Sequence, residues 1–356
     1  MKVSIITLHS IFNPGSVLQA FGLQEFLKRH GYDAKIIDYR PIYSRIGRNK
    51  IKGLLRKVIF LKNELSLKRK YESFINKRLT LTDRTYKSFS NLKKYPPEFD
   101  FYISGSDQLW NADYDCGNDG AYYLSFVKKG YKISYSTSMG KKNISDKELE
   151  KICSRVNDYS MISVREKSNS ESLAEMLNRQ VYWVCDPVFL LSRETYEEMT
   201  IDLPYKNYVV VYLSAESELL NSVVEDIKSK TGCEVILLGG NTPRCACDYH
   251  IKDLGPYDFL SLISGAKLVI SSSFHATAFS HIFHKKFGVI LPKGNGERIE
   301  SLLQLTGLTS RIITDRSDFA SIYEEIDYSE VDEKLQKFID YSKDVLLNAL
   351  LRKSDA

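Results

Sequence analysis

Residues 263–291, with the sequence ISGAKLVISSSFHATAFSHIFHKKFGVIL, constrain the fold more than any other stretch of the chain. The run Leu-Val-Ile at 268–270 is short and fully apolar, which is typical of a strand buried on both faces of a parallel sheet. We predict a strand over 267–270, a helix over 274–284 and a second strand over 287–291. A strand that leads directly into a helix and then into another strand indicates an α/β fold.

The junction between the first strand and the helix is a candidate anion site. Three serines at 271–273 follow the strand, and any of them can cap the helix. Helix N-termini at the carboxyl ends of parallel strands bind anions through free N–H groups. His275 lies in the first turn, where it could give a proton to a bound anion. It also shares a helix face with Phe279 and Ile282, so a buried structural histidine is the alternative.

The rest of the chain also alternates between predicted strands and helices. Its 356 residues are long for one core and typical of two domains. We predict a first α/β domain over 1–190, a linker over 191–206 and a second α/β domain over 207–330. A C-terminal helix within 331–356 is expected to pack back towards the first domain. Both domains are predicted to be doubly wound, Rossmann-like parallel sheets that face each other across a cleft.

The composition indicates an ordinary globular protein. Hydrophobic residues make up 43% and charged residues 27% of the chain, and no apolar run approaches the ~18–20 residues of a membrane span. The six cysteines are scattered, which fits a reducing cytoplasm. Cys245, Cys247 and His250 lie close together, but a structural zinc site needs four ligands, usually at wider cysteine spacing. We therefore predict a cytoplasmic protein with no metal site.

A strongly basic helical insert is predicted within the first domain, over residues 42–97. Residues 45–94 contain sixteen Lys or Arg against three Asp or Glu, although the whole chain has a net charge of only +5. Apolar residues recur at helical spacing in 54–61 and in 67–75, so we predict two basic amphipathic helices. This charge is either a solvated helical face or a surface that docks on anionic lipid. No nucleic-acid-binding motif accompanies it, and we predict no nucleic-acid partner.

Two further strand ends carry candidate site residues. The segment Gly-Ser-Asp at 105–107 follows one predicted strand, and Arg165 follows another. Asp107 could contact a substrate hydroxyl or form an Asx turn. Arg165 could bind a carboxylate or phosphate with its planar guanidinium, or pair with a neighbouring glutamate on the surface. Trp110 could stack on a ligand ring or pack in the core.

Several of these segments resemble the polysaccharide pyruvyl transferase family. The segment SSSFHATAFSHIFHKKFGVI at 271–290 is similar to the family's C-terminal signature, and GSDQLWN at 105–111 is similar to a second block. Further matches lie elsewhere in the chain: Asn13, Gly15, the Leu-Gln-Ala at 18–20, Arg165 and Asp186-Pro187. The resemblance spans nearly the whole chain. We expect Asp186 to shape the loop between the domains rather than to react.

The resemblance implies a GT-B-like fold and a ketal pyruvyltransferase. Such an enzyme transfers pyruvyl from phosphoenolpyruvate, its co-substrate, to two hydroxyls of one sugar in a lipid-linked polysaccharide precursor, and it needs no cofactor. The product is a cyclic ketal, and phosphate is released. We assign His275 as the general acid and Asp107 as the group that orients or deprotonates a sugar hydroxyl. The predicted donor-binding residues are Arg165, Ser272, Ser273, Arg298 and Lys285, and the predicted acceptor-binding residues are Asn13, Gly15, Gln108 and Trp110.

One position departs from the family pattern. Many members carry an arginine two residues before the motif histidine, as a second donor contact, and this chain has Ser273 there. Either the serine and the helix N–H groups bind the donor without this arginine, or a cation that is near in sequence substitutes for it. The candidates for that substitution are Lys285, Lys286 and Arg298.

Two other functions fit the residues. A GT-B glycosyltransferase would use the same helix N-terminus to hold the diphosphate of a nucleotide sugar. A non-catalytic sugar-binding protein of a capsule-assembly complex would not need the missing arginine. For the favoured function we expect a location at the inner face of the membrane, where the basic insert meets anionic lipid and a lipid-linked acceptor.

Overall fold

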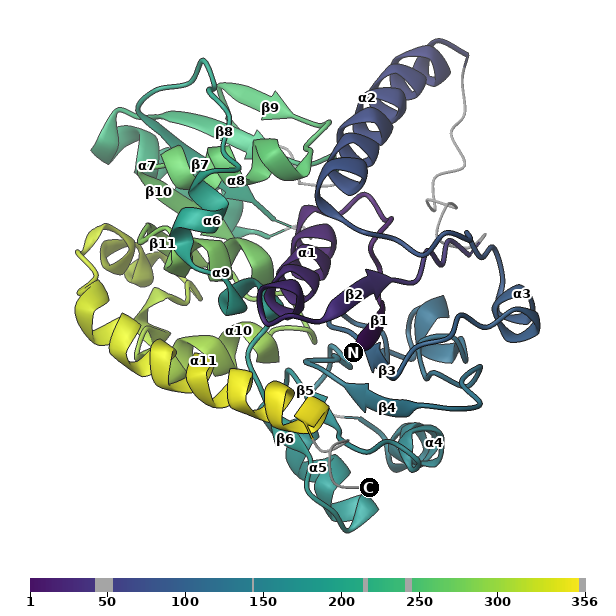
Figure 1. Ribbon diagram of the computed structural model, residues 1–356. Helices are drawn as coiled ribbons and strands as arrows, with labels where there is room; N and C mark the ends of the chain where they lie inside the picture. The colour runs from purple at the N-terminus through teal and green to yellow at the C-terminus, as the bar shows by residue number, and fades with distance from the viewer. Residues whose placement is uncertain (42–53, 143, 214–216, 241–244, 352–356) are drawn as a thin grey trace.

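The chain is built from two parallel β-sheets with helices packed around them (Figure 1). The computed structural model describes residues 1–41, 54–142, 144–213, 217–240 and 245–351. The first sheet comes from the N-terminal half of the chain, and the second comes from the C-terminal half. Residues 42–53, which belong to the predicted basic insert, lie outside the described residues.

The first sheet has four strands in the order β2-β1-β3-β4, all parallel. These strands are β1 (Lys2–Ile6), β2 (Asp33–Ile36), β3 (Phe101–Ser104) and β4 (Tyr131–Ser134). Two short parallel strands, β5 (Ser163–Val164) and β6 (Tyr182–Trp183), pair with each other. Bridges from Ile133 to Met161 and from Thr137 to Val164 attach this pair beside β4. Because the strands are parallel, the loops that follow β1, β3 and β5 leave from the same edge of the sheet.

Helices and 3-10 turns connect the strands of the first half. They are α1 (Pro14–Arg29), α2 (Leu54–Arg78), α3 (Phe89–Lys94), η2 (Asp115–Asn118), α4 (Asp146–Val156), α5 (Lys167–Leu177), η3 (Pro187–Leu190) and α6 (Arg193–Glu197). Helix α1 ends just before Gly31, whose φ of 81° suits glycine because it has no Cβ to clash in the left-handed region. The chain can therefore turn at once into β2.

The second sheet has five parallel strands in the order β11-β10-β7-β8-β9. Its strands are β7 (Tyr208–Tyr212), β8 (Glu234–Leu238), β9 (Tyr249–Ile251), β10 (Leu268–Ser271) and β11 (Lys286–Val289). Its helices and turns are α7 (Leu219–Thr231), α8 (Pro256–Gly265), α9 (Phe274–Ile282), α10 (Glu297–Thr306), η4 (Thr309–Arg311), η5 (Arg316–Tyr323) and α11 (Tyr328–Leu351). The strand, helix and strand predicted within 263–291 are confirmed as β10, α9 and β11. Strand β10 is fully buried between β7 and β11, which accounts for its apolar sequence.

The basic insert forms one long helix where we predicted two. The apolar positions of 54–61 and 67–75 lie on the single helix α2, so that prediction is wrong. Helix α3, also in the insert, is short and lies farther along the chain. No proline or glycine interrupts residues 54–78, and their Lys, Arg, Leu and Glu favour an unbroken helix.

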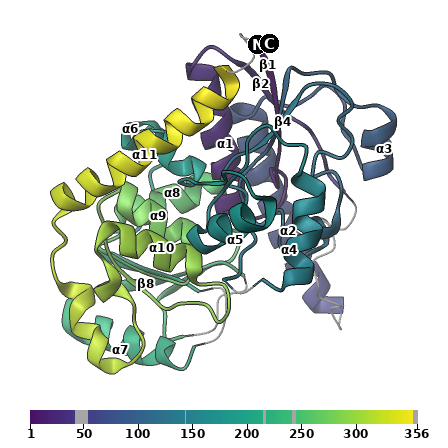
Figure 2. The ribbon, with the colours of Figure 1, turned by 90° about the horizontal axis from the view of Figure 1, so that it is seen from below.

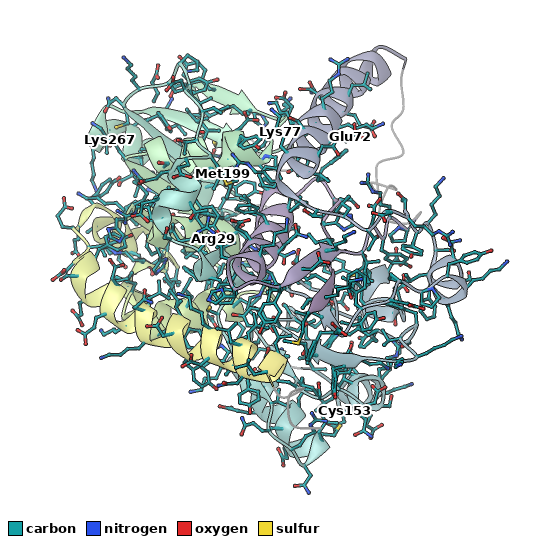
Figure 3. All side chains as sticks on the ribbon, viewed as in Figure 1. Arg29, Glu72, Lys77, Cys153, Met199 and Lys267 are labelled. Carbon is teal, nitrogen blue, oxygen red and sulfur yellow. The ribbon has the colours of Figure 1, made fainter. Side chains whose placement is uncertain are left out.

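Helix α2 connects the two halves of the molecule. Lys70 Nζ lies 3.1 Å from Asp253 Oδ2 and 2.8 Å from Asp258 Oδ2, both in the second half. Exposed charged side chains such as Glu72 and Lys77 project from other faces of the helix (Figure 3). Part of the basic charge of α2 is thus neutralised within the molecule, and part faces solvent.

The C-terminal helix α11 extends along both halves (Figure 2). Near its start, Asp332 Oδ2 lies 2.9 Å from His284 Nε2 in the second half. Farther along, Ser342 Oγ accepts a hydrogen bond from the backbone N of Cys185 in the first half (2.9 Å). The helix is therefore held to both halves by polar contacts.

Candidate active site

The N-terminal turns of α1 and α9 are in contact at the carboxyl edges of the two sheets. Gly15 lies in the first turn of α1, and His275 lies in the first turn of α9. A Cβ added to Gly15 would lie 2.1 Å from His275 Nδ1, so only glycine leaves room for the imidazole. Asn13 caps α1, and its Oδ1 accepts a hydrogen bond from Ser16 N (3.3 Å). Two positive helix ends therefore meet around His275.

Asp107 follows β3 and is held by two hydrogen bonds. Its φ of 83° is uncommon for a residue other than glycine and is typical of functional loops. Ser16 Oγ donates to Asp107 Oδ2, and Gln108 N donates to Oδ1 (2.8 Å). Burial raises the pKa of the Asp107 carboxyl, but the charge of Arg165 and the Ser16 hydrogen bond outweigh burial and lower it overall. Asp107 is thus an ionised carboxylate whose Oδ1 lies 3.8 Å from Arg165 Nη2.

Asp186 is a second buried acidic group of this cluster. Arg165 Nη1 and Ser106 Oγ (3.0 Å) both donate to Asp186 Oδ2, and Val188 N donates to Oδ1 (3.1 Å). His275 Nε2 lies 3.7 Å from the same Oδ2. Burial raises the pKa of Asp186, but the charge of Arg165 and the contact with His275 lower it well below its ordinary value. One carboxylate therefore contacts both of the residues we predicted to be central.

Arg298 is a second guanidinium at the site. The aromatic ring of Phe274 lies 4.8 Å from the guanidinium carbon of Arg165 and 5.8 Å from that of Arg298. Arg298 Nε lies 4.0 Å from Oε1 of the buried Glu166. Burial and the charge of Arg165 lower the pKa of Arg298 to about 10, so it stays protonated at neutral pH. Of the three cations considered as substitutes for the family arginine, Arg298 is the one that reaches the site.

Several buried nitrogen atoms of this cluster have no hydrogen-bond partner within the described residues. They are Arg165 Nε and Nη2, Arg298 Nε and His275 Nε2. A buried polar atom without a partner costs about 1–3 kcal/mol, and more when it is charged. Such atoms are retained where a ligand completes them. The arrangement is suited to an anion with several oxygen atoms.

Two predicted site residues do not reach this cluster. Lys285 lies beyond the C-terminal end of α9, beside β11, so the whole helix separates it from His275. Trp110 is 1% exposed, donates Nε1 to Tyr122 O (3.3 Å) and stacks on Tyr123, with ring centroids 5.7 Å apart. The donor-binding prediction for Lys285 is therefore wrong. For Trp110, packing in the core is the alternative that the structure supports.

The remaining predicted residues lie at the site or line its edge. Ser273 caps α9 by accepting from Ala276 N, and Ser272 precedes it at the end of β10. Gln108 follows Asp107 directly and accepts a hydrogen bond from Asn111 Nδ2 (2.7 Å).

Sequence reasoning missed the parts played by Asp186, Ser106, Ser16 and Glu166. Asp186 comes shortly after β6, as Asp107 and Arg165 follow β3 and β5. The same strand-end argument therefore pointed to it. The interpretation as a loop-shaping residue overlooked that a buried aspartate needs cationic partners.

A family model described as polysaccharide pyruvyl transferase matches residues 13–293. No protein with a curated description matches the sequence. The match includes the segments that carry Asn13, Asp107, Arg165 and His275. It covers most of the chain.

Solved structures resemble the whole chain in fold. A UDP-N-acetylglucosamine 2-epimerase has a TM-score of 0.57 at 12% identity, over 100% of this chain and 96% of that one. The putative enzyme of that name from Listeria monocytogenes has a TM-score of 0.54 at 10% identity, over 99% and 96%. The Neisseria meningitidis enzyme bound to UDP-GlcNAc has a TM-score of 0.51 at 9% identity, over 98% and 94%. These likenesses confirm the predicted GT-B-like fold of two Rossmann-like sheets.

The contact between Gly15 and His275 predicts that Gly15→Ala is destabilising. The added methyl group must displace the imidazole or separate α1 from α9, at a cost of about 1–3 kcal/mol. Urea unfolding should show that loss, and the ring signals of His275 should shift in NMR spectra. Gly240→Ala is the control, because the nearest atom to its new Cβ would be 3.9 Å away. Equal stability of Gly15→Ala and wild type would contradict the contact.

The pairing of Asp186 predicts a pH-dependent loss of stability in Asp186→Asn. At pH 7 we expect a loss of about 3–5 kcal/mol, because the buried Arg165 loses its hydrogen-bonded carboxylate and keeps only the more distant Asp107, 3.8 Å away. A carboxyl whose pKa is lowered by folding stabilises the protein above its unfolded pKa of about 4 and loses that contribution at lower pH. The difference between variant and wild type should therefore shrink between pH 5 and pH 3 in urea unfolding.

The matched control for this experiment is Asp158→Asn. Asp158 pairs with Lys132, but its side chain is 62% exposed, so the change should stay within about 1 kcal/mol at every pH. A loss in Asp186→Asn that is equally large at pH 3 and pH 7 would show that the carboxylate charge is not the cause.

Proposed function

Because the chain belongs to the polysaccharide pyruvyl transferase family, we propose that this pyruvyl transferase takes its pyruvyl group from phosphoenolpyruvate. The acceptor is a pair of hydroxyls on one sugar of a surface-polysaccharide precursor. The product is a cyclic ketal, and phosphate is released. The observation that carries the proposal is the convergence of unpartnered, buried nitrogen atoms from Arg165, Arg298 and His275.

The charge of the site supports a donor with two anionic groups. Phosphoenolpyruvate carries a carboxylate and a phosphate, and arginine binds either group with paired N–H donors. Arg165 uses Nη1 for Asp186, which leaves Nε and Nη2 for the donor. Arg298 takes the place of the family arginine that is absent at Ser273. The N-terminus of α9 adds backbone N–H groups.

The proposed reaction needs one proton donor at the donor's methylene carbon. His275 gives its proton to that carbon, and the neighbouring carbon becomes oxocarbenium-like. One sugar hydroxyl attacks this carbon, and the C–O bond to phosphate then breaks. The second hydroxyl attacks the same carbon and closes the ring. The proton of one sugar hydroxyl returns to His275, and the proton of the other hydroxyl leaves with phosphate.

Asp107 is proposed to orient the attacking hydroxyl. Its lowered pKa keeps the carboxyl ionised, so it accepts a hydrogen bond but is a weak base. Ser16 and Gln108 fix the carboxylate, so the hydroxyl would meet it in one orientation. Asn13 and Gly15, in the adjacent turn of α1, are proposed to line the acceptor side.

The basic helix α2 supports docking to an anionic membrane that carries a lipid-linked acceptor. Lys68, Arg69, Lys77 and Arg78 are exposed on its described turns, and each cation near an anionic surface adds about 1 kcal/mol of attraction. Residues 45–53, which contribute to the predicted docking surface, lie outside the described residues. Among the helices that the structure describes, none has the length and apolar character that crossing a bilayer requires.

The function is tested by phosphorus NMR of the protein with phosphoenolpyruvate and lipid-linked saccharides from its own organism. Wild type should release one phosphate for each ketal formed. His275→Gln should release phosphate at least about 100-fold more slowly, because general acid catalysis contributes 10²–10⁴. His284→Gln is the control, since His284 pairs with Asp332 away from the site. No phosphate release by wild type with any of these acceptors would overturn the function.

Arg165→Lys should weaken donor binding while leaving acceptor binding largely unchanged. Lysine keeps the charge but lacks the planar fork, and one charged hydrogen bond is worth about 1.5–3 kcal/mol, or roughly 10- to 150-fold in affinity. The rise in melting temperature with phosphoenolpyruvate, which reports binding to the folded state, should therefore shrink. The control Lys285→Met should show the same rise in melting temperature as wild type, because Lys285 lies away from the site. If phosphoenolpyruvate raised the melting temperature of Arg165→Lys as much as that of wild type, Arg165 would not be a donor-binding residue.

A further inference from the structure

We propose that a pocket beneath the C-terminal end of α11 is a second saccharide-binding site. The pocket has a volume of about 520 Å³ and lies between α11 and the strands β3, β4 and β6. Such a volume is within the range of ligand pockets in proteins. The inference rests on the proposed function, because it identifies the bound molecule as a further part of the acceptor chain.

The pocket lies at the opposite edge of the first sheet from the catalytic cluster. Phe101 and Tyr131, which line it, are the first residues of β3 and β4. Asp107 follows the other end of β3, six residues after Phe101 and therefore at most about 20 Å away along the strand. None of the residues assigned to the donor or acceptor lines the pocket. It is thus a separate site on the same domain.

Three tyrosines provide aromatic surface in the pocket. Tyr341 on α11 is 45% exposed, and Tyr131 and Tyr182 are half-buried on the sheet side. Tyr131 stacks on Phe101, with ring centroids 5.1 Å apart and planes at 24°. Tyrosine combines an apolar ring with a polar hydroxyl. Sugar rings present apolar C–H faces bordered by hydroxyls, so they match both parts of the side chain.

The pocket is also lined by polar groups that a ligand could reach. They are the hydroxyls of Tyr131, Tyr182 and Tyr341 and the side chains of Asp344 and Asn348; Tyr131 and Tyr182 are half-buried and the other three are exposed. Hydroxyl, carboxylate and amide groups together offer both donors and acceptors. Their number exceeds what an apolar ligand could use. A molecule with many hydroxyls satisfies them.

The residues that line the pocket carry no net charge. Arg179 is the cation among the lining residues, and its Nη1 and Nη2 donate to the backbone O of Asn157 (3.3 Å) and of Tyr159 (2.7 Å). Asp344 adds a negative charge beside it. A neutral saccharide therefore matches the pocket better than phosphoenolpyruvate or a nucleotide diphosphate, each of which carries several negative charges.

The test measures binding of lipid-free oligosaccharides, prepared by mild acid hydrolysis of the organism's own surface polysaccharide. Titration calorimetry and saturation-transfer NMR are done on the full chain without phosphoenolpyruvate. We expect the double variant Tyr341→Ala/Asn348→Ala to weaken binding at least tenfold. Both side chains are exposed, so the variant should fold, and circular dichroism and melting temperature confirm that it does. Tyr249→Ala, an exposed tyrosine on β9, is the matched control and should bind as wild type.

The catalytic variant His275→Gln separates this proposal from the proposed function. It should bind the oligosaccharide as wild type does, although it releases phosphate at least about 100-fold more slowly. The pocket double variant should instead release phosphate normally with a single sugar unit, with KM raised only for long acceptors. Three results would each overturn the second site. They are unchanged binding in the double variant, loss of binding in His275→Gln, and no binding by wild type at millimolar concentration. Binding at the pocket without phosphate release by wild type would overturn only the function.

Discussion

The buried carboxylate of Asp186 is the group on which the candidate site depends. An anion removed from water is stable only when cations and hydrogen-bond donors surround it. Arg165 and Ser106 supply these from the first half of the chain, and His275 approaches the same oxygen from the second half. The carboxylate thereby holds a guanidinium and an imidazole next to each other, and it leaves some of their nitrogen atoms unpaired. A ligand with anionic oxygens completes them.

The two sheets place this cluster where helix N-termini converge. Because every strand is parallel, the loops after β1, β3, β5 and β10 all leave from the carboxyl edges of the sheets. Helix α1 follows β1 and helix α9 follows β10, and their first turns meet at Gly15 and His275. Both helix ends contribute positive potential to one small volume. His275 and Asp107 are each only 7% exposed.

Local patterns predicted most of the elements and several of the site residues. Apolar runs bounded by serine or glycine identified β10 and β3, and the rule that ligands gather at carboxyl ends selected Asp107, Arg165 and His275. The errors came from distances that sequence does not report. Lys285 is near His275 in sequence, but α9 carries it to the other end of the helix. Trp110 adjoins site residues, yet its ring turns into the core. The helix α2 was divided in two because periodicity identifies a helical face better than it identifies helix ends.

The sequence by itself determined the α/β class and the helix that presents His275. These follow from hydrophobic periodicity and from backbone limits that act within a few residues. Only the tertiary structure decided that Arg298 lies beside Phe274 and Arg165, and that Asp186 joins Arg165 to His275. These contacts link residues from different strands and different sheets, so they depend on how the two halves pack. The physical reason is that charge pairing in a buried site depends on distances in space, which local sequence patterns do not contain.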